Sequence, residues 1–175
     1  MSEFKIDDLK GKLTGGGARA NLFKTRFTFP FGTGVVNLAS HLCKAAQLPG
    51  SVVGQIDVPY RGRVLKLAGD RTFENWTVTF INDEGFDIRD AFERWMNLIN
   101  QHEQGEGRVN PEDYMAQMEV IQLSRDGSTP LKTIQITDAF PVNISAIDLS
   151  YDTTDAIEEF TVEFAYLHWK SNTTS

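Results

Sequence analysis

The sequence predicts a mainly β protein: an antiparallel β-barrel or sandwich with one flanking α-helix at about residues 87–100 and a short helix near residues 37–46. Most of the chain after residue 20 consists of short segments in which apolar and polar residues alternate, separated by Gly, Pro and Asp-Gly turns. One longer segment has instead the apolar spacing of an amphipathic helix. Strands on both sides of one main helix are typical of an antiparallel sheet with a helix packed on it.

The length and charge of the chain limit the classes to which it can belong. A chain of 175 residues suits one domain, and a folded protein of 19.6 kDa has a surface of roughly 8,600 Å². A formal net charge of −7 argues against a protein that grips nucleic acid through its phosphates. No apolar run reaches spanning length and no signal peptide begins the chain, so we expect a reducing cytoplasm and no membrane insertion.

The first elements follow in chain order. Residues 1–20 are polar and end in GGGARA, so we expect a flexible N-terminal arm followed by a single domain at residues 21–175. Alternation in NLFKTRFTFPF predicts a half-buried strand over residues 21–31 that ends at Pro30. The segment 37–46, NLASHLCKAA, has one apolar side and predicts the short helix.

Residues 48–70 hold extended pieces separated by Gly and Pro. Pro59 has no backbone N–H and makes an interior strand position unfavourable, so we expect this segment at a sheet edge. An exposed edge is a hazard for a monomer because its unpaired backbone groups recruit other chains. It is useful in a protein that assembles.

The next segment predicts a strand and a helix that pack together. Trp76, Val78 and Phe80 alternate with threonines, and the turn Asp83-Glu84-Gly85 separates this strand from the helix. Asp87 is the expected N-cap. We expect the apolar side chains of the two elements to form the contact between the helix and the sheet: Trp76, Phe80, Phe92, Trp95, Met96 and Ile99.

The rest of the chain predicts further strands. Residues 114–137 have the pattern of two strands joined around Asp126-Gly127. Residues 140–154 form another extended segment. In residues 158–169 the large apolar side chains alternate with Thr161 and Glu163, which places Glu163 on the face opposite Phe160, Val162 and Phe164.

Motifs for catalysis or cofactor binding are weak. FGTGVVN after the first strand lacks the third glycine of a dinucleotide-binding motif, and no β–α–β alternation follows it. His41, His102 and His168 lack the spacing of metal ligands. Cys43 is expected to be a small buried side chain. We expect no enzyme, no cofactor and no metal.

The chain resembles the tail tube proteins of contractile-tailed phages of the T-even type. The resemblance rests on LPG, VPYRGR, AGDRTFE, INDE, RDAFERW and TTDAIEEFTV in this order, together with NLFKTRFTF and LCKAAQLPG near the N-terminus. It covers most of the chain from about residue 20, and it carries little information at residues 101–111.

The resemblance implies a structural virion protein, assembled in the host cytoplasm, with a β-barrel-like subunit and a flanking helix. Six-membered rings of such subunits stack into a hollow tube. The tube encloses the tape-measure protein, later passes DNA, and lies inside a contractile sheath. Baseplate and tail-terminator proteins are further implied partners. Tube proteins of type VI secretion and related injection devices, and a tube-initiating baseplate protein of the same fold, remain alternatives within this architecture.

Two sets of residues are candidates for assembly and transport. The extended basic segment predicts a contact between rings or between subunits of a ring, and the N-terminal arm is expected to contribute to it. The candidate residues of the segment are Pro59, Tyr60, Arg61, Arg63, Asp70 and Arg71. A negative tube wall would repel DNA, and the candidates for it are Asp152, Asp155, Glu158 and Glu163, with Glu159 beside them. Asp152 and Asp155 have a second interpretation, at a ring edge opposite a cation of a neighbour.

A different class, a small enzyme or a ligand-binding barrel, is the competing hypothesis. It requires a pocket with convergent polar groups.

Overall fold

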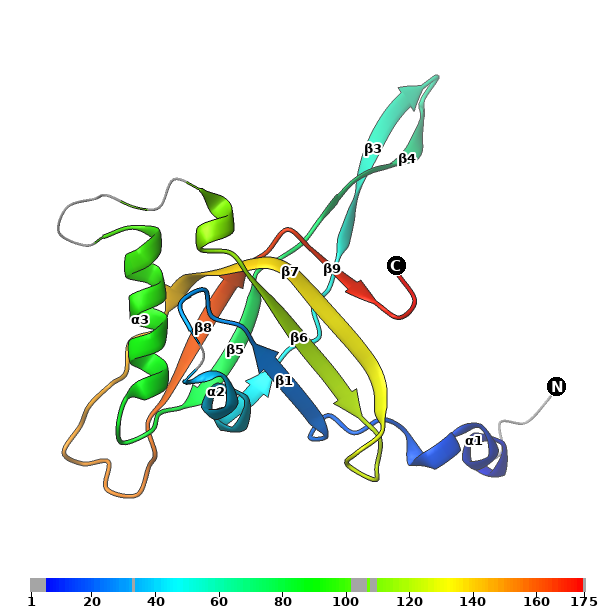
Figure 1. The fold of residues 1–175 in the computed structure, drawn as a ribbon. Helices are drawn as coiled ribbons and strands as arrows, with labels where there is room; N and C mark the ends of the chain where they lie inside the picture. Colours follow the sequence, from blue (N-terminus) through cyan, green and yellow to red (C-terminus); the bar gives the residue numbers. More distant parts are fainter. Residues whose placement is uncertain (1–5, 33, 102–106, 108–109, 175) are drawn as a thin grey trace.

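The computed structural model describes residues 6–32, 34–101, 107 and 110–174 (Figure 1). Its elements in chain order are α1 (Ile6–Lys12), η1 (Thr14–Gly16), β1 (Phe23–Phe27), α2 (Val36–Leu42), β2 (Cys43–Ala46), β3 (Val52–Tyr60), β4 (Arg63–Thr72), β5 (Trp76–Ile81), α3 (Asp87–Ile99), η2 (Pro111–Asp113), β6 (Ala116–Leu123), β7 (Pro130–Ile144), β8 (Glu159–Ala165) and β9 (His168–Ser171).

Seven strands form the main sheet, in the order β1-β6-β7-β8-β5-β2, and β9 pairs with β7 beside this path. The long strand β7 organises it. The half of β7 up to Ala139 pairs with β6, and the half from Phe140 pairs with β8. Asp138 lies in an irregularity of the β6–β7 pairing, just before the change of partner, and has a positive φ of 55°. One bent strand thus belongs to both halves of the sheet.

The two halves of the sheet face each other across the core. The ring of Phe27 on β1 lies 6.0 Å from that of Trp76 and 5.2 Å from that of Phe80, both on β5. The terminal strands β1 and β2 do not pair with each other in the described chain. The predicted class, mainly antiparallel β with a flanking helix, is therefore confirmed, but the sheet is open rather than closed into a barrel.

Helix α3 packs its apolar face on the sheet. The ring of Phe92 lies 5.2 Å from that of Phe80 and 5.8 Å from that of Phe164, and Trp95 lies 6.2 Å from Phe164. The side chains of Trp76, Phe80, Phe92 and Trp95 are at most 1% exposed. Met96 and Ile99 are only partly buried, because they border an open groove lined by Phe140, Pro141 and Val142.

The helix begins at the predicted residue but is not capped as predicted. Asp87 lies inside α3, and the N-cap is Phe86, whose φ is +56°. The carboxylate of Asp83 accepts the backbone N–H of Asp87 at 3.1 Å and that of Ile88 at 3.4 Å. Two of the N-terminal donors of the helix are thus satisfied by Asp83 in the preceding turn rather than by the side chain of Asp87.

The predicted short helix at residues 37–46 is half wrong. Helix α2 ends at Leu42, and residues 43–46 form β2, which pairs with β5 through Cys43 and Phe80 and through Ala46 and Val78. The backbone groups of β5 need a partner on this side, and this pairing outweighs the helix propensity of the two alanines. The last predicted strand also divides, because β8 ends at Ala165 and β9 begins at His168 on the other half of β7.

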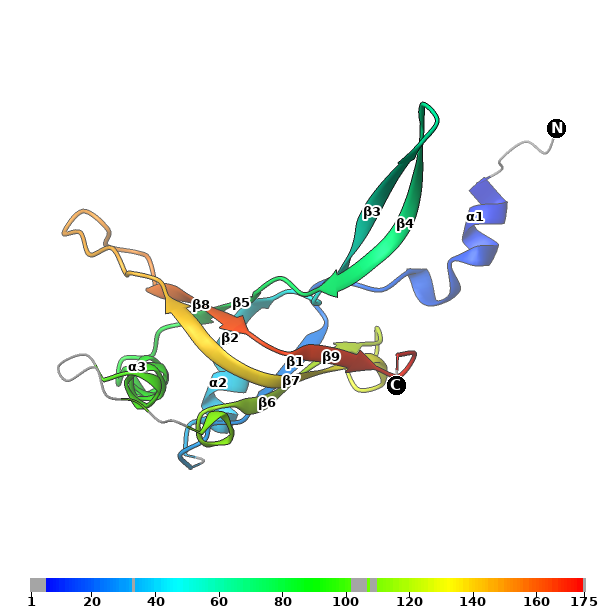
Figure 2. The same ribbon diagram turned by 90° about the horizontal axis from the view of Figure 1, so that it is seen from above.

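The N-terminal arm contains the helix α1, which the sequence did not predict, and none of its residues is buried. The division of the chain at residue 20 remains a prediction. Both α2 and α3 lie on one side of the β5–β8 part of the sheet, and the pair β3–β4 extends to the other side (Figure 2).

Candidate assembly surfaces

Strands β3 and β4 form a two-stranded sheet of their own, which projects far beyond the main sheet (Figures 1 and 2). Every residue of β3 is exposed, and in β4 only Gly69 is not. An isolated hairpin is at best marginally stable in water. This hairpin is therefore expected to gain its stability from a neighbour.

The two faces of the hairpin differ in polarity. Cross-strand partners share a face, so the pairs Ile56–Leu67 and Val58–Leu65 lie on one side together with Tyr60. These five residues are between 39% and 67% exposed. We call them the apolar hairpin face. A contiguous apolar surface of this kind marks an interaction site in a soluble protein.

The tip of the hairpin is basic and strained. A two-residue turn joins Tyr60 to Arg63, and Arg61 and Gly62 both have positive φ, 45° and 79°. Such turns favour Asn-Gly, because glycine has no Cβ and the short polar side chain of asparagine hydrogen-bonds locally in this backbone region, which the long side chain of arginine does not do. The guanidinium of Arg61 lies 5.4 Å above the centre of the Tyr60 ring.

Pro59 lies inside β3, opposite Val64. Both strands of a two-stranded sheet are edge strands, so Pro59 lies at a sheet edge as expected. In a hairpin with a two-residue turn this second pair is the one without hydrogen bonds, so the proline nitrogen faces outward and leaves the ladder intact. It also prevents another strand from pairing with this edge at that point.

The structure divides the predicted contact residues between two places. Pro59, Tyr60, Arg61 and Arg63 are at the tip, whereas Asp70 and Arg71 are at the base. A bulge at the base brings the two backbones together, and a Cβ on Gly69 would lie 3.2 Å from the carbonyl of Gly54.

A second exposed segment, residues 145–158, lies at the end of the molecule opposite the hairpin (Figures 1 and 2). We call it the acidic loop. Asp148, Asp152 and Asp155 are exposed there. Three large apolar side chains of the loop are also exposed, Leu149 (79%), Tyr151 (105%) and Ile157 (72%).

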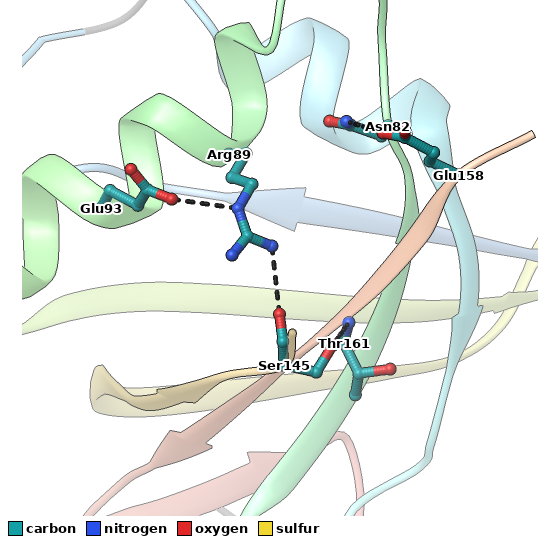
Figure 3. A network of polar contacts seen from close by, with 6 residues as sticks. All are labelled: Asn82, Arg89, Glu93, Ser145, Glu158 and Thr161. Carbon is teal, nitrogen blue, oxygen red and sulfur yellow. Dashed lines mark hydrogen bonds and ion pairs between the residues drawn. The ribbon is translucent and has the colours of Figure 1, made fainter. Parts of the chain in front are cut away.

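Hydrogen bonds fix both ends of the acidic loop (Figure 3). Arg89 of α3 donates to the carbonyl of Ser145 at 3.1 Å and to the carboxylate of Glu93 at 3.0 Å, and its guanidinium lies over the Phe160 ring. At the other end, the side-chain amide of Asn82 donates to the carboxylate of Glu158 at 2.9 Å. The loop is therefore held at its base while its middle faces solvent.

The predicted wall residues lie in three places. Asp152 and Asp155 are in the acidic loop, and Glu158 is held against Asn82 at its base. Glu163 lies in β8, between Thr77 and Asn143 on the face opposite the core. Glu159, at the start of β8, forms an ion pair with Lys44.

The described residues do not assemble a reactive centre. Burial raises the pKa of the Cys43 thiol, which disfavours the nucleophilic thiolate. His41 donates to the carbonyl of Asn37, His168 lies in β9, and His102 lies outside the described residues. Among the described residues no group of three or more His, Cys, Asp and Glu side chains could hold a metal.

The described part of the chain also has a cleft beside α3. This cleft is open and is lined by Phe31, Val35, Asp90 and Arg94 among others. All strand pairings among the described residues are antiparallel, so the glycines of FGTGVVN belong to no β–α–β unit.

The helices of the described residues are too short or too polar to span a bilayer.

The surface area of the chain is large for its mass. The chain exposes 12665 Å², about half as much again as the roughly 8,600 Å² expected of a compact monomer. A stable interface covers about 800 Å² on each partner. The excess leaves room for several interfaces on each copy.

Comparison with known proteins identifies the family of this chain. The family model described as phage tail tube protein matches residues 18–172. The chain belongs to the phage tail tube protein family. The tail tube protein gp19 of Enterobacteria phage T4 is 32% identical over 170 residues, which cover 94% of this chain and 99% of that protein.

Solved structures share the fold of this tail tube family member. A chain of the anti-feeding prophage baseplate superposes with a TM-score of 0.67 at 14% identity, covering 89% of this chain and 95% of that one. A chain of the sheath–tube complex of the PVC extracellular contractile injection system has a TM-score of 0.57 at 13% identity, with 89% and 91% covered. Family membership makes this protein a structural component of the phage tail rather than an enzyme.

Proposed function

We propose that this tail tube protein forms six-membered rings that stack into a hollow tube, with the hairpin as the principal contact between copies. The apolar hairpin face carries this proposal, because its five large side chains are left exposed by the described residues of the same chain. The tube encloses a tape-measure protein during assembly and then conducts DNA. The Asp70–Arg71 base and the arm would add to the same contact.

We propose that the outer face of β5 and β8 lines the bore of the tube. This face carries Thr77, Thr79 and Ile81 of β5 and Glu159, Thr161 and Glu163 of β8. Of its two carboxylates, Glu159 forms an ion pair with Lys44. The other face holds the aromatic core under α3. Six copies of a chain with a charge of −7 carry about −42 per ring. A negative wall repels phosphate and keeps contacts with DNA short-lived.

We also propose a sheath protein, a tail terminator and a baseplate as partners. The similarity in fold to a chain of an injection-system sheath–tube complex supports the first of these. A tube-initiating baseplate protein is the second candidate function, favoured by the similarity to a baseplate chain. The 32% identity with a main tail tube protein over nearly the whole chain favours the main tube.

Negative-stain microscopy of the purified, concentrated protein tests the proposal. We expect rings with six-fold symmetry and hollow filaments that lengthen with concentration, because the exposed apolar surface favours association. Solution mass supplies the second readout. A small species of fixed mass at all concentrations, without rings, would contradict a tube and would favour a ligand-binding barrel.

The position of the bore predicts the effect of a charge reversal. Phage that carry Glu163→Lys should eject DNA more slowly than the parent, and the difference should shrink at high salt because cations on the wall bind phosphate by counterion release. Glu84→Lys makes the same charge change in the exposed turn before α3 and serves as the control. Equal ejection rates for the parent and Glu163→Lys would show that Glu163 does not line the bore.

A further inference from the structure

We infer that the hairpin of one copy docks on the acidic loop of the next copy. This inference rests on the proposed tube and names the surface that receives the hairpin. Residues 52–72 contain four cations and two carboxylates, a net charge of +2. Residues 145–158 contain four carboxylates and no cation, a net charge of −4. Opposite charges on two surfaces of one chain steer copies together in one orientation.

The positions of the two surfaces suit repeated association. The hairpin and the acidic loop extend from opposite ends of the subunit, as both views show (Figures 1 and 2). The hairpin therefore cannot reach the loop of its own chain. A contact between different patches on two copies leaves one unused patch of each kind, so it continues into rings or filaments.

Both surfaces also carry apolar groups that need cover. The apolar hairpin face supplies aliphatic side chains and Tyr60, and the acidic loop supplies Leu149, Tyr151 and Ile157. The side chain of Tyr151 is completely exposed in the single subunit. Tyrosine and arginine are the residues most often found at the energetic centres of interfaces. Arg61 and Tyr60 at the hairpin tip supply both types.

Both surfaces are already ordered in the single subunit. The contacts of Arg89 with Ser145 and of Asn82 with Glu158 hold the ends of the acidic loop. At the hairpin tip, Arg61 occupies a left-handed backbone position where Asn or Gly would be less strained. Strain of this kind is typical of functional residues, and here it accompanies the stacking of the Arg61 guanidinium over the Tyr60 ring at the end of the hairpin.

A second exposed apolar group, at α1, is a weaker partner for the acidic loop. It consists of Ile6 and Leu9 in α1 and of Leu13 just after the helix. The charges of α1 balance, because Asp7 and Asp8 accompany Lys10 and Lys12. A neutral helix gives no electrostatic preference for a loop of carboxylates.

Reciprocal charge reversal tests the pairing. Arg61→Glu/Arg63→Glu and Asp152→Arg/Asp155→Arg should each reduce the polymerised fraction at least about tenfold, because each places like charges opposite one another. The chain with all four substitutions should polymerise to within about threefold of the parent, since its contact has the same charges exchanged. Sedimentation and negative-stain microscopy measure the polymer, and an unchanged circular dichroism spectrum of each variant shows that it is folded.

A matched control addresses the arm. Lys10→Glu/Lys12→Glu changes the same number of charges on α1, and it should not restore polymerisation to Asp152→Arg/Asp155→Arg. Restoration by the α1 reversal, or failure of the four-substitution chain to recover while the parent still polymerises, would overturn the pairing and leave the tube standing. A parent chain that forms no rings or tubes under these conditions would instead contradict the proposed function.

Disulfide trapping supplies an independent measurement. Two chains are mixed, both with Cys43→Ser, one with Tyr60→Cys and the other with Tyr151→Cys. Oxidation of the assembled mixture should produce a dimer that joins the two different chains, because only neighbours in contact bring these positions within disulfide range. The absence of this dimer from well-formed tubes would overturn the pairing.

Discussion

Replacing Trp95 with alanine is expected to lower the free energy of unfolding by roughly 3–5 kcal/mol, the range for loss of a buried aromatic side chain. Trp95 is 0% exposed, and its ring lies 5.4 Å from that of Phe29 and 6.2 Å from that of Phe164. Its indole N–H also donates to the carbonyl of Tyr114 at 2.7 Å. The variant therefore loses packing and leaves a carbonyl without its donor.

Thermal denaturation of the unassembled subunit measures this effect. For a chain of this length a loss of 3–5 kcal/mol lowers Tm by roughly 6–20 °C. Trp169→Ala is the matched control, because Trp169 lies partly exposed on the edge strand β9 and donates to the carbonyl of Gly50 at 3.1 Å. We expect its loss to be no more than about 2 kcal/mol. Equal Tm values for Trp95→Ala and the parent would show that α3 does not dock through this residue.

Loss of two side chains from the apolar hairpin face is expected to abolish assembly and leave the subunit folded. Val58 and Leu65 are cross-strand partners, 39% and 58% exposed in the single chain. Full burial of each side chain contributes roughly 1.5–3 kcal/mol to an interface. Val58→Ser/Leu65→Ser should thus raise the critical concentration for assembly by about a hundredfold or more.

The opposite face of the hairpin provides the control. Val53 and Val64 are similarly exposed, 48% and 56%, but they project on the other side. Val53→Ser/Val64→Ser removes as many apolar side chains from the same ribbon and should change the critical concentration much less. The thermal midpoint of both unassembled variants should stay close to that of the parent, because surface substitutions rarely exceed about 0.5 kcal/mol. Equal assembly of the two double variants would mean that the apolar hairpin face is not the contact.

Elements whose pattern reports burial could be predicted from the sequence. Alternation in β5 and β8 and the apolar stripe of α3 follow directly from which side faces the core. The short strand β2 could not be predicted, because its conformation depends on an edge of β5 that lies more than thirty residues away in sequence. The N-cap was wrong for a related reason: Asp83 can satisfy the helix donors only because Phe86 adopts a left-handed backbone.

The assembly role of the candidate surfaces stays a prediction, and the structure adds to it the apolar side chains that these surfaces carry. The prediction of a contact at residues 48–70 was based on the basic residues of this segment. The apolar face is indicated by a different pattern, the alternation of Ile56, Val58 and Tyr60 in one strand and of Leu65 and Leu67 in the other. This signal becomes readable once the two-residue turn at Arg61-Gly62 gives the pairing register. Loop positions such as Asp152 and Asp155 have no periodicity, and their distance from Glu163 could come only from the structure.

The long strand β7 has a consequence for how the subunit comes apart. It pairs with β6 and β9 in one half of the sheet and with β8 in the other, so one continuous backbone belongs to both halves. Neither half can melt without removing a strand from the other. We expect a single cooperative unfolding transition, in which a subunit waiting in the pool is either whole or fully unfolded. Few free subunits are then partly unfolded. Unpaired strand edges, which could bind to the end of a growing tube in a wrong position and stop its growth, are correspondingly rare.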